Sequence, residues 1–137
     1  MKNILVAVDG SAPSLHAART AIDIAEATDG AVTLVYVVPQ PLLPEDIPFP
    51  TGSIMEEAVK TGETLLDEAQ RSLGARACKK ICITGATAES ITALADAEGS
   101  DLIVVGSKGR GAVARVLIGS TTDRLVHISR KPVLVVR

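Results

Sequence analysis

The chain alternates short apolar runs with longer segments whose apolar residues recur every three or four positions. Runs of the first kind are typical of buried strands, and segments of the second kind of helices with one buried face. The runs predict five strands, at residues 3–9, 31–38, 78–84, 101–106 and 133–136. The segments predict four helices, at residues 11–28, 53–73 and 87–98 and after Gly119. Strands and helices in this order indicate one doubly wound α/β domain over residues 1–137, with a five-stranded parallel sheet and helices on both faces.

Capping residues and prolines mark the predicted boundaries. Ser11 is the expected N-cap of the first helix and Thr87 that of the third, and the hydroxyl-rich run from Ser120 to Asp123 is expected to cap the last. Residues 39–50 contain five prolines. A lid, a partner contact and an inert crossover would each produce such a segment.

One stretch, Gly106-Ser107-Lys108-Gly109-Arg110-Gly111, concentrates glycines and cations directly after an apolar strand. Three glycines in six residues let backbone N–H groups approach an anion without interference from Cβ atoms. Lys108 and Arg110 add positive charge. Further along, Gly119-Ser120-Thr121 opens the last predicted helix, and a helix N-terminus is itself an anion site. We interpret the region as a phosphate-binding loop.

Three other interpretations of this loop are a Walker A loop, a dinucleotide fingerprint and a plain flexible turn. A Walker A loop needs Lys and then Ser or Thr after its last glycine, but Ala112 follows Gly111. The dinucleotide fingerprint fits residues 109–114, yet these lie near the end of the sequence, and Asp123 does not end a following strand. A plain flexible turn is the remaining alternative. The clustering of glycines, cations and hydroxyls favours phosphate binding.

Asp9, Val37 and Gly106 lie at the carboxyl ends of predicted strands. Ligands of doubly wound sheets bind at this edge, where the strand order reverses. If the first and fourth strands are neighbours, Asp9 faces the glycine loop and can accept hydrogen bonds from ribose hydroxyls. The alternative is that Asp9 only forms a turn with Gly10.

Composition narrows the partners. The only aromatic residues are Tyr36 and Phe49, which leaves almost no surface for stacking the bases of single-stranded nucleic acid. The first apolar run, Ile4 to Val8, is too short for a signal peptide core or a membrane span. The sequence therefore predicts a cytoplasmic protein without nucleic acid or membrane partners. Cys78 and Cys82 are not spaced as C-x-x-C and are expected to be buried small residues, so no metal site is predicted.

Charge is distributed unevenly along the chain. Residues 1–107 hold seven Lys or Arg and fifteen acidic residues, whereas residues 108–137 hold seven Lys or Arg and one acidic residue, Asp123. The basic segment coincides with the proposed phosphate loop. A solvated basic tail explains the same distribution equally well.

Together these residues resemble a universal stress protein of the nucleotide-binding branch, a Rossmann-like family, over essentially the whole length. The resemblance begins with Ile4 to Ser11, continues through Ser100 to Ser107 and ends with Pro132 to Val136. Its diagnostic pattern, G-x2-G-x9-G-[ST], is met by Gly106, Gly109, Gly119 and Ser120.

The resemblance implies bound ATP, with or without Mg²⁺. It implies Asp9 near the ribose and the main chain of Val37 near the adenine. The phosphates are expected over Gly106, Gly109, Gly119, Ser120 and Thr121, with Lys108 and Arg110 beside them. Thr121 departs from the family, because an apolar residue is frequent there in relatives.

The function expected on these grounds is a dimeric, nucleotide-dependent switch or sensor in stress adaptation, with an unknown protein partner. The apolar strand Val133 to Val136 is expected to lie at a sheet edge and to pair with its own copy. Asp9 is the one well-placed acid for ATP hydrolysis and Asp123 a weaker candidate, so turnover is expected to be slow at most. A slow ATP hydrolase and an interaction protein with a vestigial nucleotide loop stay as alternatives.

Overall fold

The computed structural model describes residues 1–39, 52–74, 78–109 and 118–137. The proline-rich segment after Pro39 lies outside these ranges. The strands are β1 (Asn3–Ala7), β2 (Ala31–Pro39), β3 (Lys79–Gly85), β4 (Leu102–Gly106) and β5 (Val133–Val136). The helices are α1 (Ala12–Thr28), α2 (Gly52–Ser72), α3 (Thr87–Ala97) and α4 (Ser120–Ile128). The predicted alternation of strands and helices is confirmed.

The sheet is parallel throughout, with the strand order β3-β2-β1-β4-β5. β1 pairs with β2 on one side and with β4 on the other, where Ile4 is in register with Leu102. The strand order therefore reverses between β1 and β4, as the sequence analysis supposed. β5 forms one edge of the sheet.

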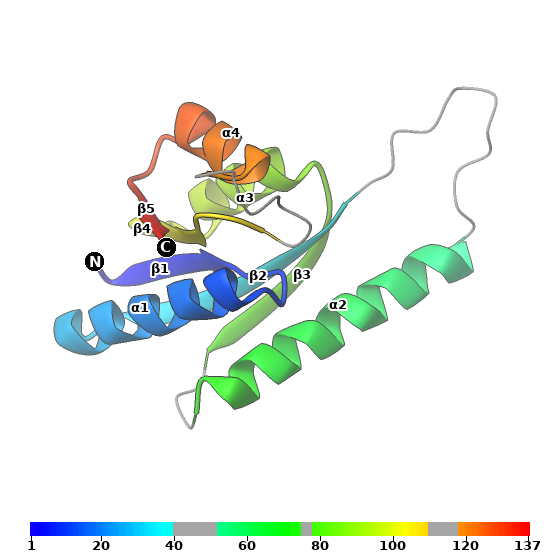
Figure 1. Cartoon of the computed structure of the whole chain (residues 1–137), viewed down its shortest axis with the longest axis horizontal. Helices are drawn as coiled ribbons and strands as arrows, with labels where there is room; N and C mark the ends of the chain where they lie inside the picture. Colours follow the sequence, from blue (N-terminus) through cyan, green and yellow to red (C-terminus); the bar gives the residue numbers. More distant parts are fainter. Residues whose placement is uncertain (40–51, 75–77, 110–117) are drawn as a thin grey trace.

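Helices cover both faces of the sheet (Figure 1). α1 and α2 pack on one face, and α3 and α4 pack on the other. Because successive side chains of a strand point to opposite faces, Ile4 and Val6 of β1 contribute to the first core, and Leu5 contributes to the second. All three are almost completely buried, which explains why these strands read as continuous apolar runs.

Two predicted helix caps are wrong and one is confirmed. Ser11 caps α1, and its hydroxyl accepts from the Ser14 N–H at 3.3 Å. α3 is capped by Ala86, whose carbonyl accepts the Ser90 N–H at 2.9 Å, so Thr87 is already the first helical residue. The cap of α4 is Gly119, and the hydroxyl-rich run after it forms the first turn. In both cases the backbone begins the helix one residue earlier than the preference for hydroxyl caps suggests.

α2 is the longest helix, with 21 residues. It buries only Gly62, Leu66 and Ala69, and its remaining surface is largely polar. Within the described ranges, none of the helices combines the length and the apolar character needed to cross a bilayer.

Both cysteines face the α1 and α2 side of the sheet, as their spacing predicted. Both thiols are half-buried. Burial, together with the nearby Glu63 carboxylate, raises the pKa of the Cys82 thiol. A raised pKa keeps the thiol protonated and unreactive at neutral pH.

Candidate binding site

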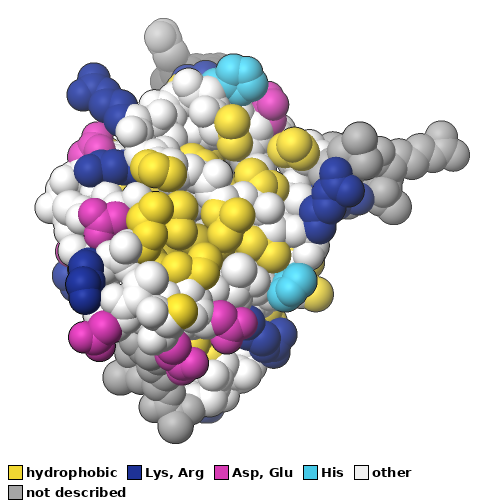
Figure 2. All heavy atoms as spheres, turned by 90° about the vertical axis from the view of Figure 1, so that its left-hand side faces the viewer, with side chains coloured by type: hydrophobic (Ala, Val, Ile, Leu, Met, Phe, Trp, Pro, Cys, Tyr) yellow, Lys and Arg dark blue, Asp and Glu magenta, His cyan; other side chains and the backbone are white. Residues whose placement is uncertain are grey.

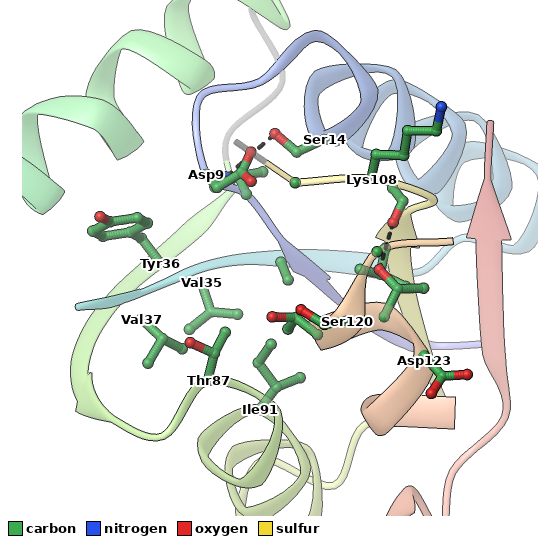
Figure 3. A pocket seen from close by; sticks show the side chains of 18 of the residues that line it. Asp9, Ser14, Val35, Tyr36, Val37, Thr87, Ile91, Lys108, Ser120 and Asp123 are labelled. Carbon is green, nitrogen blue, oxygen red and sulfur yellow. Dashed lines mark hydrogen bonds between the residues drawn. The ribbon is translucent and has the colours of Figure 1, made fainter. Parts of the chain in front are cut away.

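A cavity of about 780 Å³ opens at the carboxyl edge of the sheet, where β1 and β4 lie side by side. α1 follows β1 and packs on one face of the sheet, whereas α4 follows β4 in the chain and packs on the other face. In doubly wound sheets, a crevice forms between two neighbouring strands whose following helices lie on opposite faces. Eight of the nine predicted site residues line it: Asp9, Val37, Gly106, Lys108, Gly109, Gly119, Ser120 and Thr121. The ninth, Arg110, lies outside the described residues. Figure 3 shows the lining side chains.

α4 begins at this cavity without a side-chain cap among the described residues. Its N-cap, Gly119, is extended, and its N–H donates to the Ser107 carbonyl at 2.7 Å. The Thr122 hydroxyl donates to the Gly106 carbonyl at 2.8 Å, which ties the start of α4 to the end of β4. The first N–H groups of a helix have no intrahelical acceptor. This end of the cavity therefore offers hydrogen-bond donors and partial positive charge to an anion.

The glycines of the motif differ in how closely neighbouring atoms approach them. A Cβ at Gly106 would lie 2.9 Å from the carbonyl carbon of Pro13, so a side chain there would push β4 away from the start of α1. At Gly109 it would lie 2.8 Å from Asp9 Oδ2. At Gly119 the nearest atom, the Lys108 Cα, would be 3.5 Å away, an ordinary contact. Backbone packing explains Gly106, whereas Gly119 has no comparable packing reason among the described residues.

Asp9 is held in place by two serines. Its Oδ1 accepts the Ser11 N–H at 2.9 Å and also the Ser11 hydroxyl. The Ser14 hydroxyl accepts the Asp9 N–H at 3.2 Å and donates to the Ser11 carbonyl at 2.9 Å. Ser14 is 4% exposed, so this support is buried. Asp9 thus forms a local turn through one carboxylate oxygen and faces Gly109 with the other. The two roles considered for Asp9 from the sequence, a turn residue and a residue that faces the glycine loop, are therefore both present.

β2 extends past β1 at the cavity. The Val8 N–H donates to the Val35 carbonyl at 2.9 Å, which continues the ladder one residue beyond the last residue of β1. Alternate residues of a strand direct their peptide groups to the same side, so Val37 directs its N–H and carbonyl toward the β1 side. No described residue of β1 pairs with Val37. A donor and an acceptor therefore lie next to each other at this end of the cavity.

The same end is mainly apolar. Val35, Val37, Ile91 and Thr87 gather there in Figure 3, and all line the cavity. Of these four residues, only Val37 was predicted from the sequence to belong to the site. Ile91 and Thr87 were missed because they lie on α3, although the position of α3 directly after a strand end was a usable signal.

Few of the described basic residues from the C-terminal part of the chain lie at this cavity. Lys108 is the one basic residue of the described part of the chain that lines it. Arg124 pairs instead with Glu89 of α3, and this hydrogen bond lowers the pKa of Glu89. Arg130 and Lys131 precede β5 and so lie at the amino ends of the strands, whereas the cavity is at their carboxyl ends. For the described residues, a solvated basic surface explains most of the asymmetry.

The fold and the cavity define a doubly wound α/β protein with a binding crevice at its switch point. The sequence matches the universal stress protein family over residues 1–137, so the chain belongs to this family. A universal stress protein of Thermus aquaticus is 36% identical over 141 residues, which cover 99% of this chain and 98% of the relative. The family resemblance found in the sequence is confirmed.

Solved structures agree with the predicted fold class. The universal stress protein UspA from Lactobacillus plantarum has a TM-score of 0.76 and 26% identity, over 99% of this chain and 97% of that one. A universal stress protein solved in complex with cAMP has a TM-score of 0.73 and 27% identity, over 99% of this chain and 97% of that one.

Proposed function

We propose that this protein binds ATP in the cavity and acts in the cytoplasm as a dimeric, nucleotide-dependent switch or sensor in stress adaptation. One observation carries the proposal. A single crevice has the start of α4, where no described side chain caps the helix, at one end. The Asp9 carboxylate lies beside it, and the peptide groups of Val37 lie at an apolar end. These features suit the phosphates, the ribose and the base of one nucleotide. The cAMP carried by a related protein supports an adenine nucleotide.

The phosphates would lie over Gly109, Gly119, Ser120 and Thr121. Backbone N–H groups at the start of α4 would donate to phosphate oxygens, and the Lys108 ammonium would offset their charge. Arg110 is proposed to add a second cation. Main-chain donors and a cation recognise phosphate groups without fixing how many a ligand must carry. ATP is the proposal, and the shorter nucleotides are competitors to be measured.

The base would lie at the apolar end. Adenine carries an N–H donor at N6 beside an acceptor at N1, and Val37 offers a carbonyl and an N–H of matching kind. Val35 and Ile91 would contact the ring, because both are aliphatic side chains that line the cavity. The ribose hydroxyls would donate to Asp9, whose second oxygen faces the cavity.

Mg²⁺ is proposed to enter with ATP. The described residues contain no group of three His, Cys, Asp or Glu side chains arranged to hold a metal. Asp9 and Asp123 are the carboxylates that line the cavity. Phosphate oxygens and water would then supply most of the ligands, which is usual for Mg²⁺ bound with a nucleotide.

Dimerisation is proposed through β5. This strand forms a sheet edge, and each residue from Val133 to Val136 keeps part of its side chain exposed. The side of the molecule on which β5 lies carries a patch of hydrophobic side chains bordered by charged ones (Figure 2). Pairing with a second copy would satisfy the open edge and cover this patch.

The proposal is tested by calorimetry of ATP with two variants at one position. Gly119→Asn and Gly119→Asp both place a favourable N-cap on α4 in a position where a Cβ makes only ordinary contacts. They differ in one negative charge beside the proposed phosphates. We expect the Asp variant to bind ATP roughly tenfold to 100-fold more weakly than the Asn variant.

Circular dichroism and thermal melting serve as the control, since both variants are expected to keep the wild-type fold. Equal ATP affinity of the two variants would mean that no phosphate lies at the start of α4. A wild-type protein that does not bind ATP would refute the proposed function itself.

A further inference from the structure

The hydroxyl of Thr87 is the feature of the cavity that neither the sequence motif nor the family assignment accounts for. Thr87 is the first residue of α3 and lies at the apolar end of the cavity with Val35, Val37 and Ile91 (Figure 3). It is half-buried. A polar group among aliphatic side chains needs a hydrogen-bond partner or loses stability when it is covered.

Threonines farther along α1, α2 and α3 find that partner in their own helix. The hydroxyls of Thr20, Thr61 and Thr64 each donate to the carbonyl four residues earlier, and that of Thr92 donates to the Glu89 carbonyl three residues earlier. Thr87 has no preceding helical turn because it opens α3. Its hydroxyl makes no hydrogen bond with any residue that the structure describes.

The turn before α3 fixes this position. Gly85 ends β3 with φ 153°, and a Cβ there would lie 2.6 Å from the Ser90 hydroxyl oxygen. Pro39 of β2 is in register with Gly85. The turn from β3 to α3 therefore lies next to the end of β2, and Thr87 lines the same end of the cavity as Val37 (Figure 3).

We propose that Thr87 is a base-binding residue, whose hydroxyl hydrogen-bonds the polar edge of the nucleobase that lies against Val35, Val37 and Ile91. The inference rests on the proposed function. Ring atoms of a purine would fill the apolar space, and the polar edge would meet both the Val37 main chain and the Thr87 hydroxyl. Since a hydroxyl rotates and can donate or accept, Thr87 strengthens binding of the base at either kind of polar atom.

The opposite end of the cavity also carries hydroxyls, those of Ser120 and Thr121 at the start of α4. The two groups make different predictions. A hydroxyl at the base end contributes the same factor to every adenine nucleotide, whereas a hydroxyl at the phosphate end contributes more as phosphates are added. Affinities for ATP and AMP therefore locate the hydroxyl.

The test is calorimetry of ATP and AMP with Thr87→Val, which removes the hydroxyl and keeps the shape. We expect both affinities to fall by a similar factor, about threefold to tenfold, the usual effect of one neutral hydrogen bond. Thr87→Ser keeps the hydroxyl and should bind within about twofold of wild type. Thr92→Val is the matched control, because this threonine lies on the same helix, does not line the cavity and has its hydroxyl bonded within α3.

Unchanged affinity of Thr87→Val for both nucleotides would overturn the inference while leaving ATP binding intact. A loss confined to ATP would also overturn it, because the hydroxyl would then act on the phosphates. If wild-type protein binds neither nucleotide, the proposed function fails first, and the result is distinct from either outcome of the variant.

Discussion

Replacing Gly106 by Ala tests whether this glycine serves the fold in addition to the ligand. The end of β4 approaches the first turn of α1 so closely that an added Cβ would lie 2.9 Å from the Pro13 carbonyl carbon and 3.0 Å from its oxygen. Both atoms belong to the backbone and cannot rotate away. Either β4 or the start of α1 has to shift.

Overpacking of this kind usually costs about 1–3 kcal/mol. For a chain of this length, such a cost lowers the melting temperature by roughly 4 to 12 °C. Urea unfolding followed by circular dichroism measures the free energy directly, provided that the slope of the transition is unchanged. The matched control is Gly119→Ser, in which the added Cβ has no neighbour closer than 3.5 Å and the hydroxyl can cap α4.

The expected contrast is a destabilised Gly106 variant and a Gly119 variant within about 0.5 kcal/mol of wild type, because Ser and Gly differ by only a few tenths at an N-cap. A Gly106→Ala protein with the wild-type urea midpoint would show that β4 and α1 are not in this close contact. The reasoning about the motif's first glycine would then be wrong.

Turnover of ATP should stay well below the roughly 1 to 10³ per second of typical enzymes, because the described cavity is rich in hydrogen-bond donors and poor in general bases. Steady release of phosphate at several per second, abolished by Asp9→Asn, would refute this prediction. Val135→Lys should shift the protein toward monomer in sedimentation, since a charge would enter the proposed β5 interface, and a wild-type monomer at high micromolar concentration would contradict the dimer. Asp101 accepts the Asn3 and Lys2 N–H groups at 2.9 and 3.0 Å, which lowers the pKa of its carboxyl. Its stabilisation is present above the ordinary pKa of 3.8 and is lost as the pH falls through the lower folded value, so Asp101→Asn should reduce the urea midpoint at pH 7 and have a smaller effect near pH 2.

Periodicity was sufficient to predict the fold. Buried runs such as Leu102 to Val105 leave little choice but a sheet covered on both faces, and the connecting helices make it parallel. The adjacency of β1 and β4 was a supposition in the sequence analysis, and the structure confirms it. This pairing of β1 with β4 brings Asp9 close to Gly109, although the two residues are a hundred positions apart in the sequence.

The contribution of α3 could not be predicted in the same way. Thr87 reads as a helix cap in the sequence, because hydroxyl residues favour that position. Thr87 would be the cap if α3 began one residue later, but α3 begins at Thr87 and Ala86 is the cap. The residue at which α3 begins depends on how this helix packs on the sheet, and the spacing of residues in the sequence does not specify that packing.

Charge was misleading for a related reason. The described basic residues of the last thirty positions are close in sequence but face different directions once folded. Arg124 finds Glu89, 35 residues earlier, and only Lys108 of those described reaches the cavity. Electrostatic patterns along a chain predict a site only when the elements that carry them point the same way.

The most direct test of nucleotide binding in this crevice is a two-dimensional ¹H–¹⁵N NMR titration of the assigned protein with ATP. We expect the largest shifts at the amides of Asp9, Val37, Gly109, Gly119 and Thr121. Amides on the exposed face of α2, such as those of Glu57 and Glu68, should not move. Saturable shifts confined to the first group would support the account, and an unchanged spectrum, or shifts centred on α2, would contradict it.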